Sequence, residues 1–235
     1  MLAAAVSCLA ADYYQDAPYP QKWTHKYTSE DGLPESGADD VSFCSGAAFA
    51  AAEGGVFRLA DGSWRKVAGL PGVSFETLEC RGETLLSGGP GGLFVIHSAK
   101  AESGAAPEMV FHGHTTAAAP WRDGILAATP GGLFFIQNKE HRAVPRGGSA
   151  PGGDSLKISA IAVSEGTAWI ATDRGLAVLR DGADKTDNPE NTGGADNAPL
   201  EMLPAKKGAQ CPPAGDVRDI AAEGDTVFAA TGAGI

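Results

Sequence analysis

One short phrase recurs along the chain and limits its fold more than any other feature. The clearest copy is Ala168–Leu179, in which two apolar segments flank a polar turn that ends at Gly175. This pattern is typical of two antiparallel strands joined by a tight hairpin. Aligned on that glycine, the copies fall at Gly55, Gly92, Gly132, Gly175 and Gly234. Their spacing drifts around a period of roughly 40 residues, which is in the range of repeat proteins and of β-propeller blades.

A second polar turn with its own glycine comes before each copy. These turns are Ser45-Gly46, Arg81-Gly82, Asp123-Gly124, Glu165-Gly166 and Glu223-Gly224. An apolar run precedes each turn and is weakest in the third copy, at residues 115–121. Further turns are expected at Asp61-Gly62 and Asp181-Gly182, because Asp-Gly accepts the positive φ angles of two-residue hairpins. Each repeat therefore predicts four antiparallel strands in chain order.

Repeated four-stranded units favour an all-β fold of the β-propeller class. One small sheet cannot bury both of its faces, whereas sheets stacked face to face around an axis can. The predicted units, or blades, span residues 40–68, 75–112, 114–145, 157–204 and 217–235, the last of them incomplete. Their fourth strands are expected at residues 64–67, 109–111, 142–144 and 200–203. A β-sandwich ranks second, because it gives no reason for one glycine turn to repeat. A solenoid ranks third.

The repeats also resemble a known family. Trp169–Leu176 is similar to the repeat of the two-component regulator propellers, and Tyr27–Pro34 followed by Val41 is similar to that repeat's connecting segment. Gly69-Leu70-Pro71 echoes the connecting segment. The best-known members use the propeller as the sensory ectodomain of membrane-spanning kinases. The resemblance covers most of residues 23–235 and implies a role in ligand sensing.

Length and charge narrow the function classes. The chain has 235 residues and a formal net charge of -11. This length can bury a large core, and a single domain is expected for an all-β protein. The negative charge argues against nucleic-acid binding, which needs a basic surface. An acidic surface keeps a repetitive β protein soluble.

The N-terminal residues are expected to lie outside the blades. Residues 1–11 form a short apolar run that is too short to span a bilayer but resembles the end of a secretory signal, although it lacks a positively charged start. An irregular arm is expected at residues 12–22. Residues 23–27 are predicted to form a strand that closes the ring by completing another blade. These features favour an extracytoplasmic location, either periplasmic or secreted.

The last repeat is cut short. The sequence ends at Ile235, where the third strand of the fifth blade is expected to begin, and we therefore expect a fragment of a longer protein. Ile235 is predicted to lie at an unfinished sheet edge.

One long insertion is rich in oxygen ligands. It spans residues 181–215 and contains Asp184, Asp187, Asn188, Glu190, Asn191, Asp196 and Asn197. The spacing lacks the order and the closing glutamate of a calcium-binding loop, so a surface loop is favoured over a calcium site. Residues 146–153 form a second, glycine-rich loop.

The histidines do not define a metal site. The chain has five, at His25, His97, His112, His114 and His141. His112 and His114 would share one side of a strand, but no third ligand lies near them in sequence. We therefore assign no metal ligand.

The four cysteines, at Cys8, Cys44, Cys80 and Cys211, contain no Cys-x-x-Cys pair. Cys44 and Cys80 each precede a glycine turn by two residues and are predicted to be equivalent positions on successive blades. Buried free thiols are favoured. A Cys44–Cys80 disulfide would need α-carbons within about 7 Å, which first strands of neighbouring blades reach only near the axis.

No catalytic or cofactor-binding residue can be assigned. The glycine pairs are not followed by the Lys-Ser or Lys-Thr of a phosphate loop, no Gly-x-Ser-x-Gly elbow occurs, and the acidic residues lie mostly in turns. The preferred function is a non-enzymatic ligand-binding or sensing module. Its partner would be an unknown ligand such as a carbohydrate, or a protein, bound at one face of the propeller, with no cofactor. The alternatives are an extracellular carbohydrate-active hydrolase or lyase, and a protein-interaction scaffold.

Overall fold

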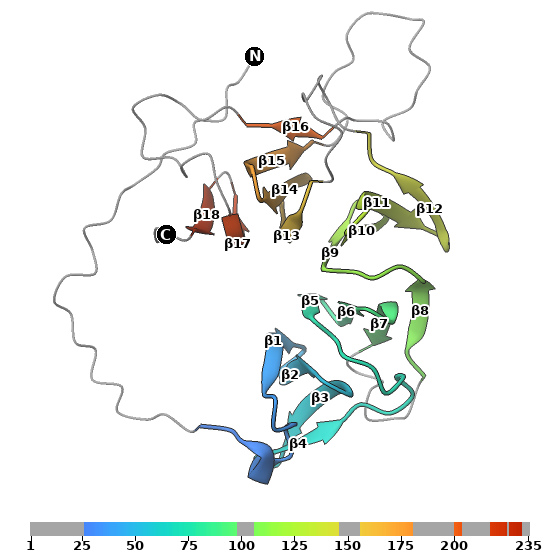
Figure 1. Cartoon of the computed structure of the whole chain (residues 1–235), viewed down its shortest axis with the longest axis vertical. Helices are drawn as coiled ribbons and strands as arrows, with labels where there is room; N and C mark the ends of the chain where they lie inside the picture. Colours follow the sequence, from blue (N-terminus) through green and yellow to red (C-terminus); the bar gives the residue numbers. More distant parts are fainter. Residues whose placement is uncertain are drawn as a thin grey trace, which may run out of the picture. The chain divides into compact units, whose positions relative to one another are not determined.

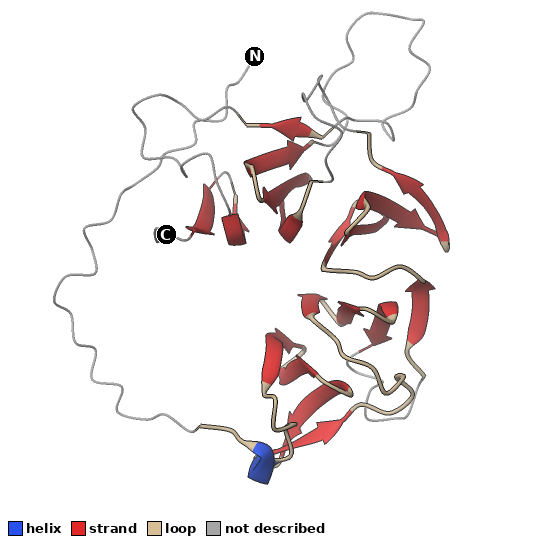
Figure 2. Ribbon diagram, in the orientation of Figure 1, coloured by secondary structure: helices blue, strands red, loops and turns tan. Residues whose placement is uncertain are grey.

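The described residues are almost entirely β-structure. The computed structural model describes residues 26–97, 106–145, 156–180, 200–203, 217–224 and 226–231. Within these ranges the only helix is the single-turn 3-10 helix η1 (Ser29–Asp31), and all other regular elements are strands (Figure 2). The all-β prediction is therefore confirmed.

The strands form small antiparallel sheets whose order follows the chain (Figure 1). Sheet 1 contains β1 (Ala38–Cys44), β2 (Ala47–Ala52), β3 (Gly55–Ala60) and β4 (Ser63–Lys66). Sheet 2 contains β5 (Thr77–Arg81), β6 (Thr84–Gly89), β7 (Gly92–His97) and β8 (Glu108–Phe111). Sheet 3 contains β9 (Ala117–Trp121), β10 (Gly124–Thr129), β11 (Gly132–Gln137) and β12 (Glu140–Ala143).

The same pattern continues toward the C-terminus. Sheet 4 contains β13 (Ile158–Ser164), β14 (Thr167–Thr172), β15 (Gly175–Leu179) and β16 (Glu201–Met202). Sheet 5 has two strands among the described residues, β17 (Val217–Glu223) and β18 (Thr226–Thr231). The predicted unit of four antiparallel strands is thus confirmed in sheets 1 to 4. Trp121 is the last residue of β9.

The aligned glycines occupy one structural position. Each is the first residue of a third strand and pairs with the last residue of the second strand. Their φ angles are 157° at Gly55, 119° at Gly92, 130° at Gly132 and 115° at Gly175, a region that favours glycine. The prediction that they fill equivalent turns is confirmed for these four, and Gly234 lies outside the described residues.

The chain divides into two compact units. The N-terminal unit is Leu9–His112, and Gly113–Ile235 belongs to the C-terminal unit. The core of the N-terminal unit contains buried residues of both sheets 1 and 2, including Phe49, Phe75 and Leu85. The core of the C-terminal unit contains buried residues of both sheets 3 and 4, including Leu126 and Ile170. In each unit, neighbouring sheets therefore bury their apolar faces against one another.

The first strands of neighbouring sheets are adjacent. Within the N-terminal unit β1 contacts β5, and within the C-terminal unit β9 contacts β13 and β13 contacts β17 (Figure 1). In sheets 1, 3 and 4, a side chain at or just before the start of the first strand bonds to the first strand of the next sheet. Leu78 N donates to Asp40 Oδ2 at 2.7 Å, Thr116 Oγ1 to Ile158 O at 3.3 Å, and Ser159 Oγ to Val217 O.

The C-terminal ends of the first strands β1 and β9 are also hydrogen-bonded to the next sheet. Ser45 Oγ donates to Gly82 O at 3.2 Å in the N-terminal unit. Trp121 Nε1 donates to Gly166 O at 3.0 Å in the C-terminal unit. Two of the polar turns that mark the repeats in the sequence, those at Gly82 and Gly166, thus supply backbone acceptors that hold one sheet to the next.

The prediction that Cys44 and Cys80 are free thiols is wrong. They form a disulfide whose α-carbons are 5.5 Å apart. Cys44 pairs with Ala47 and closes its hairpin, whereas Cys80 pairs with Leu85, one position before the closing pair. They are therefore not equivalent positions. Since side chains alternate along a strand, the one-residue offset turns the two sulfur atoms toward each other across the sheet boundary.

Several sequence-based predictions fall on residues that the structure does not describe. These are the signal-like and arm segments at 1–22, most of the closing strand at 23–27, the insertion at 181–215 except Leu200–Leu203, the loop at 146–153, and Ile235. Lys26 and Tyr27, which are described, are not in a strand. Among the described residues, no helix has the length and apolar character needed to cross a membrane.

Candidate ligand-binding cleft

Of the five histidines, His25 lies outside the described residues, and the other four are dispersed along the described chain. His112 is the last residue of the N-terminal unit, and His114 belongs to the C-terminal unit. His97 ends β7, and His141 lies in β12 with its ring against Phe134. In the described part of the chain, no three His, Cys, Asp or Glu side chains lie close enough to hold a metal ion.

The N-terminal unit has a cleft on the outer strands of sheet 1. Its volume is about 550 Å³, which is within the range of small-molecule sites. The lining residues come from β3, β4 and the residues beside them: Arg58, Ala60, Asp61, Arg65, Lys66, Val67 and Ala68. Three of these are cationic and one is acidic, so the cleft is basic on a chain whose formal net charge is -11.

The hairpin register brings two arginines together. Arg58 of β3 pairs with Arg65 of β4, so the two side chains lie opposite each other on one side of the sheet. Like charges at directly opposed positions destabilise a sheet. Arg65 Nη2 lies 3.1 Å from Asp61 Oδ2, but both side chains are largely exposed, which makes this ion pair weak.

Local sequence explains this arrangement. Asp61 and Gly62 have φ angles of 52° and 77°, as a two-residue hairpin turn requires. Strand alternation then puts Arg58 and Arg65 on one face and Trp64 on the other, where its ring packs edge-on against Tyr27 at 5.7 Å. Val67 is 7% exposed and belongs to the core between sheets 1 and 2, so it provides an apolar base.

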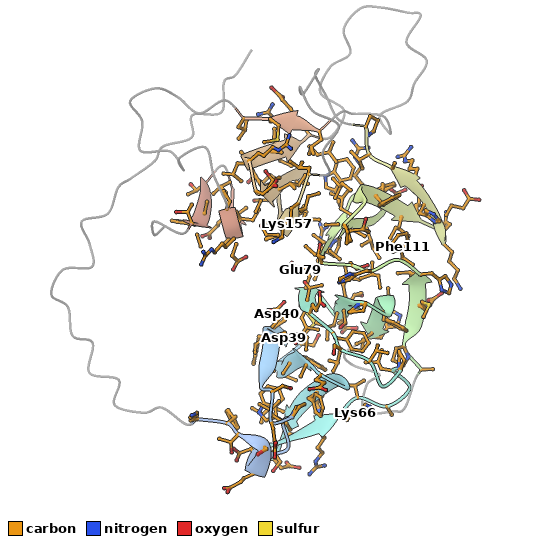
Figure 3. All side chains as sticks on the ribbon, viewed as in Figure 1. Asp39, Asp40, Lys66, Glu79, Phe111 and Lys157 are labelled. Atoms are coloured by element: carbon orange, nitrogen blue, oxygen red, sulfur yellow. A yellow bond between two sulfur atoms is a disulfide. The ribbon has the colours of Figure 1, made fainter. Side chains whose placement is uncertain are left out.

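Lys66, the next residue of β4, also lines the cleft, although alternation along the strand turns its side chain toward the face of Trp64. Figure 3 labels Lys66 on β4. Its side chain passes close to Gly55, where a β-carbon would lie 2.8 Å from Lys66 Cε. Glycine at the repeated turn therefore leaves room for the lysine stem. Arginine and lysine groups bind carboxylate, sulfate and phosphate through charge-assisted hydrogen bonds, so the cleft is suited to an anionic ligand.

This cleft is not among the sites expected from the sequence, although a signal for it is present. Once Asp61-Gly62 is taken as a two-residue turn, Arg58 must pair with Arg65. The turn therefore fixes which charges face each other as well as where the strands end.

A cluster of acidic side chains lies where β1 and β5 are adjacent. Asp39 and Asp40 of β1 and Glu79 of β5 are found there (Figure 3). Asp40 accepts hydrogen bonds from Val41 N and Leu78 N, both at 2.7 Å, so its carboxylate joins the two sheets. Asp39 is the extra residue of a β-bulge and is exposed. Bulges recur at the equivalent place in β13 and β17.

Comparison with known proteins gives a likeness of fold. No family model matches the chain, and no curated protein sequence matches it. The structure of U3-55K is similar with a TM-score of 0.56 and 13% identity, over 82% of this chain and 60% of that one. The extracellular domain of the putative hybrid two-component system BT4673 of B. thetaiotaomicron is similar with a TM-score of 0.53 and 15% identity, over 77% of this chain and 24% of that one.

An enzyme is also among the similar structures. AFV00434, an ancestral GH74 enzyme, has a TM-score of 0.51 and 13% identity, over 72% of this chain and 24% of that one. The chain thus spans about a quarter of the length of the enzyme and of the BT4673 domain. At these identities the likeness shows the fold alone.

Proposed function

We propose that the chain is part of a β-propeller that binds an anionic ligand without transforming it, as the binding portion of an extracytoplasmic sensor. The repeated glycine turn, the chain-order sheets and the adjacent first strands support the propeller arrangement. The likeness to the BT4673 extracellular domain supports the sensor class.

The observation that carries the ligand assignment is the basic cleft on sheet 1. A ligand with closely spaced negative charges could accept charge-assisted hydrogen bonds from both Arg58 and Arg65, which lie opposite each other on the sheet. Its apolar base at Val67 would suit a sugar ring. The ligand class is therefore an acidic oligosaccharide, carrying uronate or sulfate groups.

The lining favours binding over hydrolysis. Glycoside hydrolases use two carboxyl groups that flank the scissile bond. Asp61 is the single carboxylate among the residues that line the cleft, and it is bonded to Arg65. A carbohydrate-active enzyme remains the second candidate, supported by the fold likeness to AFV00434.

An extracytoplasmic location agrees with the Cys44–Cys80 disulfide. Such bonds persist in oxidising compartments and are rare in the reducing cytosol. The bond joins β1 to β5, so a reducing environment would remove a covalent link between two sheets of the N-terminal unit.

Isothermal titration with defined oligosaccharides tests the proposal. The probes are oligogalacturonate, a heparin-derived oligosaccharide, and a neutral cello-oligosaccharide of equal length. We expect the two acidic probes to bind more weakly as salt increases and the neutral probe to bind at least about tenfold more weakly.

Variants identify the cleft as the site. Arg58→Gln and Arg65→Gln should each weaken acidic-probe binding by about tenfold or more, whereas Arg81→Gln, an exposed arginine at the end of β5, should leave it unchanged. The same mixtures are assayed for new reducing ends or unsaturated products. Product formation that depends on the protein would overturn the non-enzymatic proposal, and equal binding of all probes would overturn the ligand class.

A further inference from the structure

The turn between β3 and β4 places a carboxylate at the edge of the basic cleft. Asp61 Oδ2 lies 3.1 Å from Arg65 Nη2 and accepts a hydrogen bond from it. The side chain of Asp61 is 83% exposed and that of Arg65 is 66% exposed, so both can be reached from solvent. An anionic group of a ligand that approaches Arg65 therefore meets a guanidinium to which the protein's own carboxylate is already bonded.

The corresponding turn of sheet 3 shows that the hairpin does not require this charge. Asn138 follows β11 as Asp61 follows β3, and the two residues have φ angles of 51° and 52°. In both hairpins, two residues lie between the paired ends of the strands. Asparagine forms such turns as readily as aspartate does. The backbone of the turn therefore explains a residue of this shape at position 61, but it does not explain the negative charge.

Arg65 also has a counterpart in sheet 3. Each third strand begins at its repeated glycine, and the fourth residue of that strand pairs with an arginine: Arg58 with Arg65, and Phe135 with Arg142. The Arg142 guanidinium lies over the Phe135 ring, 5.0 Å from its centroid, which is a favourable contact. In sheet 1 a second arginine takes the place of that ring, and Asp61 provides an attraction to Arg65.

We propose that Asp61 is an internal competitor of the ligand. Its carboxylate bonds to Arg65 in the unbound protein, and an anionic group of the ligand displaces it. The inference rests on the anion-binding function proposed for the cleft, and it adds the residue that limits the affinity of that site. Binding replaces one carboxylate at Arg65 by another negative group, so part of the attraction between ligand and Arg65 is offset by the loss of the Asp61 contact.

Isothermal titration of Asp61→Asn with oligogalacturonate tests this competition. The substitution removes the charge and keeps a residue that the turn accepts. We expect the dissociation constant to fall by about two- to fivefold, the effect of removing a weak, exposed ion pair. Asp123→Asn makes the same change of charge in the turn between β9 and β10, in the C-terminal unit, and should leave the dissociation constant unchanged. Circular dichroism checks that each variant is folded.

A double-mutant cycle shows whether Asp61 acts through Arg65. In the Arg65→Gln background no guanidinium remains for Asp61 to occupy, so Asp61→Asn should improve binding by a smaller factor than it does in the natural chain. A general effect of charge on the cleft would instead give the same factor in both backgrounds.

The outcomes separate this inference from the function on which it rests. If the natural chain binds oligogalacturonate but Asp61→Asn binds it no more tightly, or if the gain is equal in both backgrounds, the competitor role is wrong and the cleft proposal stands. If neither the natural chain nor Asp61→Asn binds oligogalacturonate, both proposals are wrong.

Discussion

At the residue scale, small offsets decide which side chains meet. Cys44 and Cys80 look equivalent when their glycine turns are aligned, but the turns close at different positions. Sequence alone could place both thiols near a sheet boundary. It could not show the one-residue offset that turns them toward each other, because hairpin closure depends on backbone pairing and not on residue type.

The disulfide should stabilise the N-terminal unit. It closes a loop of 36 residues. Replacing both residues, Cys44→Ala with Cys80→Ala, should lower the free energy of unfolding by about 2 to 4 kcal/mol, measured by denaturant titration. Reductant should destabilise the natural chain by a similar amount and leave the double variant unaffected. A natural chain that is insensitive to reductant would show that the bond is absent or without consequence.

Buried threonine hydroxyls should stabilise two of the repeated turns. Thr172 Oγ1 donates to Gly175 O at 2.7 Å and accepts from Arg174 N at 3.1 Å, and Thr129 makes the same pair of bonds. Thr172→Val should cost about 1 to 3 kcal/mol in thermal unfolding, since it leaves backbone groups without partners. Thr172→Ser keeps the hydroxyl and should cost less; equal losses would contradict the role of the hydrogen bonds.

At the element scale, the hairpin is the unit that the sequence specifies best. Glycine turns and apolar runs predicted the strands of sheets 1 to 4 to within a few residues, because a tight turn needs particular backbone angles and a strand needs apolar alternation. The cleft was less visible, since Arg58 and Arg65 become neighbours only once β3 and β4 are paired.

Substitutions at two of the repeated glycines, Gly92 and Gly175, distinguish the cost of backbone strain from the cost of a steric clash. Gly92 and Gly175 have φ angles of 119° and 115°, but a β-carbon would lie 2.4 Å from Phe111 O at Gly92 and would meet nothing at Gly175. Gly175→Ala should therefore cost about 1 to 2 kcal/mol from strain alone. Gly92→Ala should cost clearly more, because the contacted atom is backbone. Denaturant unfolding of the two variants should rank them in that order; the reverse order would contradict the described turns.

At the scale of the whole molecule, one stacking rule describes every neighbouring pair of sheets within each unit. In the pairs 1–2, 3–4 and 4–5, first strands lie side by side and a polar side chain bonds to the next first strand. Apolar faces meet in the pairs 1–2 and 3–4. The repeat in the sequence indicated that the sheets stack, but it did not indicate which side chains hydrogen-bond from one sheet to the next. Asp40, Thr116 and Ser159 differ in chemistry, so no motif in the sequence marks their shared role.

The most direct test of this account transfers the natural cross-link to another pair of sheets. Ser164 has the hairpin-closing position of Cys44, since it pairs with Thr167, and Ala222 has the position of Cys80, since it pairs with Val227. The double variant Ser164→Cys with Ala222→Cys is oxidised, and its disulfides are identified by non-reducing peptide mapping.

We expect a 164–222 disulfide. We expect none in the control Ser164→Cys with Ala221→Cys, because the residue at 221 points to the other face of β17. Failure of the first pair to cross-link, or equal cross-linking of both pairs, would contradict the claim that one stacking rule repeats along the chain.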